Sequence, residues 1–132
     1  MTQLKSLAAR GTRVSGEGIR GLAALRHLAS LDLSGTGIAD GDLIHLSALH
    51  RLRELRMDDT AITDAGLPAL SACVSLRLVS LDKTKILGPG LRSLAGLPHL
   101  TEVRADQTRI GIEDVLYLKR HRPGVAVTGF EP

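Results

Sequence analysis

Hydrophobic residues return at fixed places in a frame of 24 residues, and the units of this frame begin at Leu4, Leu28, Leu52, Leu76 and Leu100. The fourth position of each unit is Leu or Val and the sixth is Leu, Met or Ala, with mostly polar neighbours. This alternation predicts a short strand with one buried face. The sixteenth, nineteenth and twenty-second positions are apolar in nearly every unit, and a spacing of three predicts a short helix or 3₁₀ turn. One such unit cannot bury its own apolar face, so the units must stack into a solenoid.

The ninth position of every unit is threonine. These residues are Thr12, Thr36, Thr60, Thr84 and Thr108. Each lies where the strand must turn outward, and buried backbone groups in such a turn need hydrogen-bond partners. A threonine hydroxyl both donates and accepts, so we predict a stacked ladder of threonines that satisfies adjacent turns. The column is assigned a structural role and no binding role.

The link between strand and helix carries residues typical of helix starts. Asp40 and Asp64 are placed to accept hydrogen bonds from free helix N–H groups. Gly18, Gly66 and Gly90 share one position of the frame, which indicates tight packing or an unusual backbone angle there.

The pattern LxxLxL, followed by a Thr, an Ile and D-x-G-L-x-x-L, resembles leucine-rich repeats of the cysteine-containing or ribonuclease-inhibitor-like kind over about residues 4 to 129. The resemblance implies an α/β right-handed horseshoe, with parallel strands on the concave face and short helices on the convex face. We expect a single domain over residues 1–132, with five repeats, a partial repeat and a C-terminal cap at 124–132. Many such proteins are interaction modules, including bacterial effectors and substrate-recruiting parts of ubiquitin ligases.

The concave face is expected to hold the functional residues, because positions three, five and seven of each strand point away from the core. In the third to fifth units these positions are charged with both signs, apart from one leucine. The candidate binding residues are Glu54, Arg56, Asp58, Leu78, Asp82, Glu102, Arg104 and Asp106. Leu78, together with Leu87 in the loop of the same unit, could form a small exposed apolar spot, although single exposed leucines are common on protein surfaces.

Asp58, Asp82 and Asp106 form one column with a strand spacing of about 4.8 Å, so their carboxylates repel unless neighbouring arginines compensate. Three interpretations stay open. The column belongs to a solvated, self-compensating face, to a docking site for a basic or mixed-charge protein segment, or to a divalent cation site.

The amino-acid composition and the charge limit the kinds of partner that we expect. Aromatic residues make up only 2% of the chain, which leaves arginine as the main anchor type for an interface. The net charge is +3 and the basic residues are spread evenly along the chain, so we expect no nucleic-acid partner. The cluster at 119–122 suits the end of the last helix, with a polyanion site as the alternative.

The remaining motifs are explained by the repeat scaffold and do not indicate a cofactor or metal site. Gly16, Gly18 and Gly21 spell G-x-G-x-x-G, but they fall in the repeat's own turn and helix columns, so no cofactor is expected. No metal site is expected from the histidine spacing. Cys73 occupies a core column and is expected to be a buried, unpaired thiol. Without a signal pattern or a long apolar run, the chain is expected not to bind membranes and, if complete, to be cytoplasmic.

The leading functional expectation is a non-catalytic protein-interaction module that binds a partner protein or peptide through the concave face. The alternative is a structural or assembly unit that associates with its own copy through a poorly capped N-terminal end, which includes Leu4, Leu7 and Val14. Such a unit is compatible with a fragment of a larger effector or ubiquitin-ligase-like protein. An enzyme is not expected, because no acid/base pair has a supporting motif.

Overall fold

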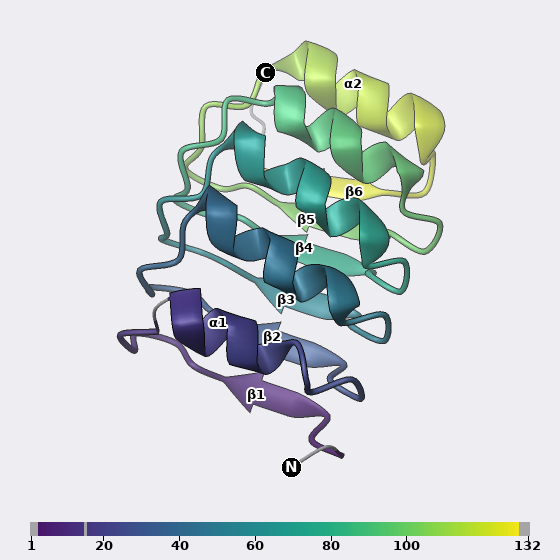
Figure 1. Cartoon of the computed structure of the whole chain (residues 1–132). Coiled ribbons are helices and arrows are strands. Elements are labelled where there is room, and N and C mark those ends of the chain that lie inside the picture. Colours follow the sequence, from purple (N-terminus) through teal and green to yellow (C-terminus); the bar gives the residue numbers. More distant parts are fainter. Residues whose placement is uncertain (1–2, 15, 130–132) are drawn as a thin grey trace.

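The chain forms a stack of strand–helix units in a computed structural model that describes residues 3–14 and 16–129 (Figure 1). The elements follow in the order β1 (Ser6–Ala8), α1 (Gly16–Leu22), β2 (Ser30–Asp32), η1 (Asp40–Ala48), β3 (Glu54–Arg56), η2 (Asp64–Ala72), β4 (Leu78–Ser80), η3 (Pro89–Gly96), β5 (Glu102–Arg104), α2 (Ile112–His121) and β6 (Ala126–Thr128). The helices labelled η are 3₁₀ helices, whose three residues per turn match the apolar spacing of three.

The strands form one parallel sheet in the order in which they occur along the chain. Equivalent positions lie side by side: Leu7 pairs with Leu31, Leu31 with Leu55, and Val103 with Val127. The helices all lie on the same side of this sheet (Figure 1). The structure therefore confirms the 24-residue register and the α/β solenoid.

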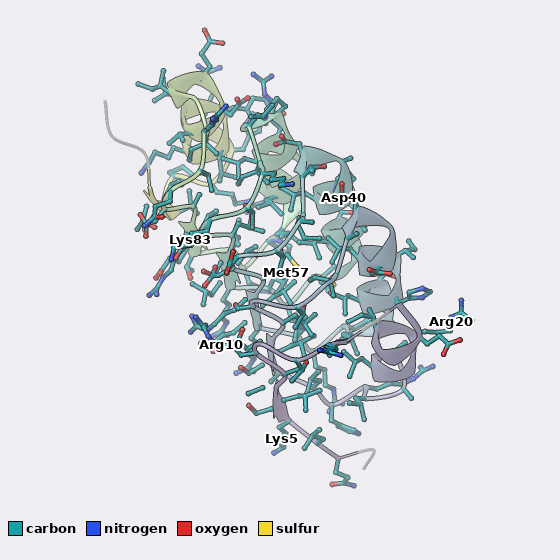
Figure 2. All side chains as sticks on the ribbon, turned by 90° about the vertical axis from the view of Figure 1, so that its left-hand side faces the viewer. Lys5, Arg10, Arg20, Asp40, Met57 and Lys83 are labelled. Atoms are coloured by element: carbon teal, nitrogen blue, oxygen red, sulfur yellow. The ribbon has the colours of Figure 1, made fainter. Side chains whose placement is uncertain are left out.

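A continuous apolar core fills the space between the sheet and the helices. The fourth, sixth and sixteenth positions of the third unit, Leu55, Met57 and Leu67, are completely buried, and Met57 lies inside the stack in Figure 2. The first unit is different, because most of its apolar residues, including Leu4 and Leu7, are only partly buried, although Ile19 is completely buried. Core packing is therefore weakest at the β1 end of the described stack.

Close packing between units explains two of the shared glycines. A Cβ atom on Gly90 would lie 2.8 Å from Cα of Asp64 and 2.9 Å from its carbonyl oxygen. A Cβ atom on Gly66 would lie 3.2 Å from Cα of Asp40. The tight-packing interpretation is confirmed at these two positions, whereas Gly18 would meet only a side-chain atom of Val14, at 3.3 Å.

The eighth position of every unit has a left-handed backbone. The φ angles are 71° at Gly11, 68° at Gly35, 52° at Asp59, 56° at Lys83 and 58° at Gln107. This conformation is uncommon for residues other than glycine. The last three units carry no glycine at this position, so the left-handed conformation is not evident from the residue types in those units.

The C-terminal end contributes the last strand of the described sheet, because β6 pairs with β5. Residues 130–132 of the expected cap lie outside the described residues, as do residues 1, 2 and 15. None of the helices in the described part of the chain combines the length and the apolar character that crossing a membrane requires.

Candidate functional site

The centre of the outward face of the sheet is built from three neighbouring strands. We call this outward face the strand face, and we call its centre the central patch, which comprises Glu54, Arg56, Leu78, Ser80, Glu102 and Arg104. Because β4 lies between β3 and β5, Leu78 has Glu54 on one side and Glu102 on the other. Ser80 lies between Arg56 and Arg104 in the same way. Two charged strands thus flank one uncharged strand.

Each charged strand of the central patch carries its own ion pair. Nη2 of Arg56 lies 3.9 Å from Oε2 of Glu54, and Nε of Arg104 donates a hydrogen bond to Oε2 of Glu102. The hydrogen bond to Glu102, followed by the attraction of the same carboxylate, raises the pKa of Arg104. Between about a third and a half of each of these four side chains is exposed. Each strand is therefore close to neutral, as a self-compensating face requires, yet it presents both charges to solvent.

The floor of the central patch is closed. Leu78 is only 8% exposed and Ser80 only 1%, so β4 is buried on both faces. The expectation of an exposed Leu78 is therefore wrong, because the longer side chains of β3 and β5 flank it on both sides. Leu87, in the loop of the same unit, is 58% exposed. The two leucines do not form the expected exposed pair.

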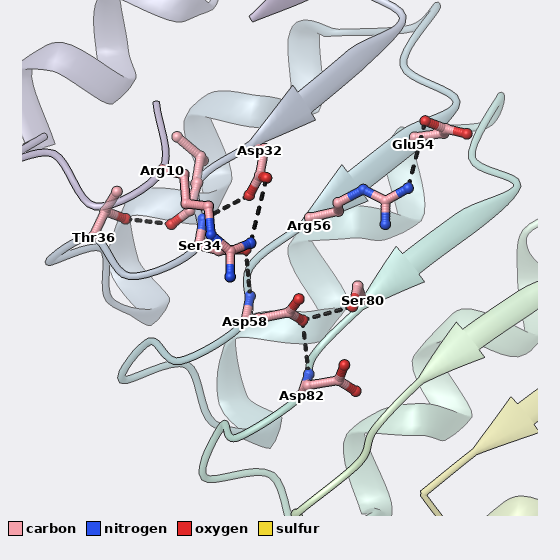
Figure 3. A network of polar contacts seen from close by, with 10 residues as sticks. Arg10, Asp32, Ser34, Thr36, Glu54, Arg56, Asp58, Ser80 and Asp82 are labelled. Carbon is pink, nitrogen blue, oxygen red and sulfur yellow. Dashed lines mark hydrogen bonds and ion pairs between the residues drawn. The ribbon is translucent and has the colours of Figure 1, made fainter. Parts of the chain in front are cut away.

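The aspartate column joins consecutive units through hydrogen bonds (Figure 3). Oδ1 of Asp58 accepts from the hydroxyl of Ser80 at 2.6 Å and from the backbone N–H of Asp82 at 2.9 Å. Oδ1 of Asp82 accepts from the N–H of Asp106 at 2.7 Å. In the preceding unit, Oγ of Ser34 accepts from the N–H of Asp58 at 3.0 Å. These side chains hold the stack together, and Asp106 is the most exposed member of the column.

The carboxylates of the aspartate column still repel one another. Burial raises the pKa of Asp82, and the nearby carboxylates of Asp58 and Asp106 raise it further against the opposing hydrogen bond from the N–H of Asp106. Among the described residues no three acidic, histidine or cysteine side chains are placed to hold an ion together, so this geometry gives the divalent cation interpretation no support. The carboxylates are directed at backbone N–H groups of the next unit instead.

The threonine column works within single turns. Oγ1 of Thr36 donates to the carbonyl of Leu33 at 2.6 Å, and Oγ1 of Thr60 donates to the carbonyl of Met57 at 2.7 Å. The other three threonines make the same bond to the residue three positions earlier. The predicted ladder between adjacent turns is therefore wrong. Each hydroxyl satisfies its own turn, and the serine and aspartate column two positions earlier links the units.

Asp40 and Asp64 accept hydrogen bonds from the unit that follows. Oδ1 of Asp40 accepts from the N–H of Thr63 at 2.8 Å. The carboxylate of Asp64 accepts from the N–H groups of Leu87 at 2.7 Å, Gly88 at 3.1 Å and Gly90 at 2.8 Å. The predicted acceptor role is confirmed, but its donors lie in the loop and helix start of the next unit.

Cys73 is buried among the core residues, as expected from its column. Its thiol donates to the carbonyl of Leu46 at 3.2 Å. Burial raises the pKa of this thiol to about 11. A protonated, enclosed thiol is a poor nucleophile and a poor metal ligand, so Cys73 belongs to the scaffold.

Comparisons with known proteins agree with this architecture. A family model described as leucine-rich repeat matches residues 24–47. The fold is similar to an internalin, inlF, from Listeria monocytogenes, with a TM-score of 0.81 and 22% identity over 100% of this chain and 36% of that one. Internalin C2 from the same species gives a TM-score of 0.75 and 24% identity over 96% of this chain and 52% of that one. The tropomodulin C-terminal domain from Caenorhabditis elegans gives a TM-score of 0.72 and 22% identity, over 93% of this chain and 84% of that one.

This chain spans about a third of the inlF internalin and about half of internalin C2. No curated protein sequence matches it. None of these matches distinguishes the cysteine-containing or ribonuclease-inhibitor-like subtype, which stays a prediction.

Proposed function

Because this chain is a leucine-rich-repeat protein, we propose that it recognises a partner protein through its strand face, without catalysis. Domains of this kind are generally protein-interaction modules. The observation that carries the proposal is the central patch, where β3 and β5 each present a glutamate followed by an arginine in the same register. The two charged strands are separated by two strand spacings, roughly 10 Å.

The charges of the central patch suit a partner segment that itself carries both signs. An incoming carboxylate would take a forked pair of hydrogen bonds from Arg56 or Arg104, which is the strongest geometry available to arginine. An incoming cation would be attracted by Glu54 or Glu102, and at the end of the strands by the exposed Asp106. A partner that exchanges the intramolecular pairs for intermolecular ones loses little charge compensation. The central patch therefore favours partners by the order of their charges and not by the burial of apolar surface.

Reversing the charge order tests the proposal. In a variant with Glu54→Arg, Arg56→Glu, Glu102→Arg and Arg104→Glu, each strand keeps a neutral pair but presents it in the opposite order. We expect partner capture from cells of the native organism to fall at least tenfold, since like charges now meet across the interface, at a cost of about 1.4 kcal/mol or more. The measurement is quantitative mass spectrometry of proteins cross-linked to a photoreactive residue at position 126, where the exposed Ala126 of β6 lies next to Glu102.

A matched control carries Glu17→Arg and Arg20→Glu, which exchange two exposed opposite charges away from the central patch and keep the net charge. Arg20 lies on α1, on the helix side of the stack (Figure 2). Undiminished capture by the charge-order variant, together with loss in the control, would place the interface on another face.

A second candidate function is end-to-end self-association through the first unit. Leu4 and Leu7 are only partly buried, whereas their equivalents Leu28 and Leu31 are 0% and 1% exposed. Strand β1 has β2 as its partner, and its other edge is the open edge of the described sheet. A second copy of this chain at that edge would bury the exposed layer.

Sedimentation velocity at increasing protein concentration tests this second candidate. We expect a dimer whose population falls in Leu4→Lys and is unchanged in Leu87→Lys, a matched change at an exposed leucine on another unit. A monomer at every concentration would contradict self-association. The charge-order variant should dimerise normally, since the central patch stays free in an end-to-end pair.

A further inference from the structure

Acidic residues are absent from one segment that recurs in every repeat unit. Of the 14 acidic residues, none falls in the segments that return from each helix to the next strand, residues 23–29, 47–53, 71–77, 95–101 and 119–125. These segments contain Arg26, Arg51, Arg53, Arg77, Lys119, Arg120 and Arg122. They stack along one edge of the molecule, on the right in Figure 1, which we call the return rim. Ten of the 17 basic residues lie outside these segments, so the return rim is distinguished by its lack of acidic residues.

A hollow of about 440 Å³ opens on the return rim. It is lined by Lys5, His27, Ala29, Arg51, Arg53 and Ser75. Lys5, Ala29 and Arg53 occupy the second position of three consecutive units. Their backbones are hydrogen-bonded in sequence: the N–H of Ala29 donates to the carbonyl of Lys5 at 2.7 Å, and the N–H of Arg53 donates to the carbonyl of Ala29 at 2.8 Å. The small side chain of Ala29 thus leaves space between two cationic neighbours.

The hollow presents donors and positive charge. Nη1 of Arg51 lies 2.7 Å from Nδ1 of His27. Because a guanidinium has no acceptor, Arg51 is the donor, and the proton of the neutral His27 ring lies on Nε2. The ion pairs found among residues 3–14 and 16–129 involve Arg10, Arg56, Arg92 and Arg104, and none involves a cation of this hollow. No carboxylate lines it.

We propose that this hollow binds a small molecule that carries one or two phosphate groups. A phosphate group carries up to two negative charges and accepts hydrogen bonds in several directions, which matches Lys5, Arg51 and Arg53 around one space. A single carboxylate would neutralise only one of these three cations. The ligand's phosphate sits above Ala29, between Lys5 and Arg53. The hollow shares no residue with the central patch, so this binding goes beyond the proposed recognition of a protein.

Inorganic pyrophosphate is the probe for this proposal. We expect saturable binding by isothermal titration calorimetry, with NMR amide shifts concentrated at residues 27–30 and 51–54. Arg53→Gln and Lys5→Gln should each weaken binding by about tenfold, because each removes a charge-assisted hydrogen bond. Arg13→Gln and Arg20→Gln remove the same charge elsewhere and should change the affinity less than about twofold.

The Ala29→Met variant distinguishes binding of pyrophosphate in the hollow from nonspecific attraction to the positively charged return rim. This variant fills the hollow and keeps every charge, so we expect it to lose about as much affinity as Arg53→Gln. Thermal melting by circular dichroism shows whether each variant folds. Lys5 and Arg53 are both exposed, so their variants test the site even where Ala29→Met is destabilised.

Three results would overturn the proposal. If pyrophosphate binding does not saturate, the binding to the return rim is nonspecific electrostatic attraction. The same conclusion follows if binding is unaffected in a folded Ala29→Met variant. Tighter binding of a hexaglutamate peptide than of pyrophosphate would make the rim a surface for acidic protein segments. Loss of pyrophosphate binding leaves the charge-order experiment on the central patch unaffected, so the two proposals fail separately.

Discussion

At the scale of single residues, the buried thiol of Cys73 offers a direct test of core packing. Burial raises its pKa to about 11. At about pH 8 the thiolate is then roughly one part in a thousand of the total, and access is blocked as well. We expect no reaction of native protein with a thiol-specific disulfide reagent over an hour, and complete reaction in denaturant. Rapid reaction of the native protein would show that the third and second units separate easily.

The carboxylate of Asp82 is a second residue with a measurable effect. Its raised pKa means that the folded state holds the proton more tightly than the unfolded chain does. The stability that this group contributes is therefore full at low pH and is lost as the pH rises through the folded pKa, which lies above the ordinary aspartate value of about 4. At neutral pH the ionised Asp82 therefore stabilises the fold less than its protonated form would.

Asp82→Asn should remove this penalty. The amide oxygen can still accept the N–H of Asp106, while the repulsion from Asp58 and Asp106 disappears. We expect the free energy of unfolding in urea to rise by about 0.5 kcal/mol at neutral pH, within the range for like charges on neighbouring strands. The gain should vanish near pH 3, where the carboxyl group of the unmodified protein is protonated. An equal gain at both pH values would rule out charge as its cause.

At the scale of elements, Asp64 connects the start of η2 to the next unit. Asp64→Ala would leave the N–H groups of Leu87, Gly88 and Gly90 without their acceptor. We expect a loss of about 3 kcal/mol in the free energy of unfolding, and a smaller loss for Asp64→Asn, which keeps an oxygen acceptor.

Asp42→Ala is the matched control for Asp64, because Asp42 also lies in the first turn of a helix but accepts one bond, from the N–H of Ala39 in its own unit. The free energy of unfolding should fall by about 1 kcal/mol in Asp42→Ala. Equal losses in Asp42→Ala and Asp64→Ala would show that bonds between units matter no more than local capping.

The elements themselves could be predicted from the sequence, because apolar residues must recur wherever strands and helices face one core. The contacts between units could not. The bonds of Asp58 and Asp64 join residues 22 to 26 positions apart, and nothing in the repeat frame says whether a carboxylate points to solvent or to the next backbone. For the candidate site, the sequence located the charged strands, but the burial of Leu78 depends on how long its neighbours' side chains are.

At the scale of the whole molecule, stability should vary along the stack. Apart from Ile19, the first unit packs its apolar residues only partly, whereas Leu55, Leu67 and Leu91 in the third and fourth units are completely buried. Units of a solenoid contact mainly their neighbours, so local opening need not involve the entire chain. We expect amide hydrogen exchange to be fastest in residues 4–25 and slowest in residues 52–97. Uniform protection would show that the stack opens only as a whole.

The same stack positions two surfaces independently. The central patch depends on the register of β3, β4 and β5, whereas the hollow on the return rim depends on Ala29 standing between two units with longer side chains. Both arise from variation at outward positions while the core positions stay constant. A rigid repeat thus allows separate surfaces to change without altering the fold.

The hydrogen bonds of the aspartates also have a direction. Asp40, Asp58, Asp64 and Asp82 each accept from the unit that follows, so the acceptor always belongs to the earlier part of the chain. A polypeptide leaves the ribosome with its N-terminus first. At these four aspartates each newly made unit therefore meets an acceptor that is already in place, whereas Arg92 donates to Asp114 of the unit that follows it. For the bonds of these four aspartates, the order of synthesis and the order of assembly coincide.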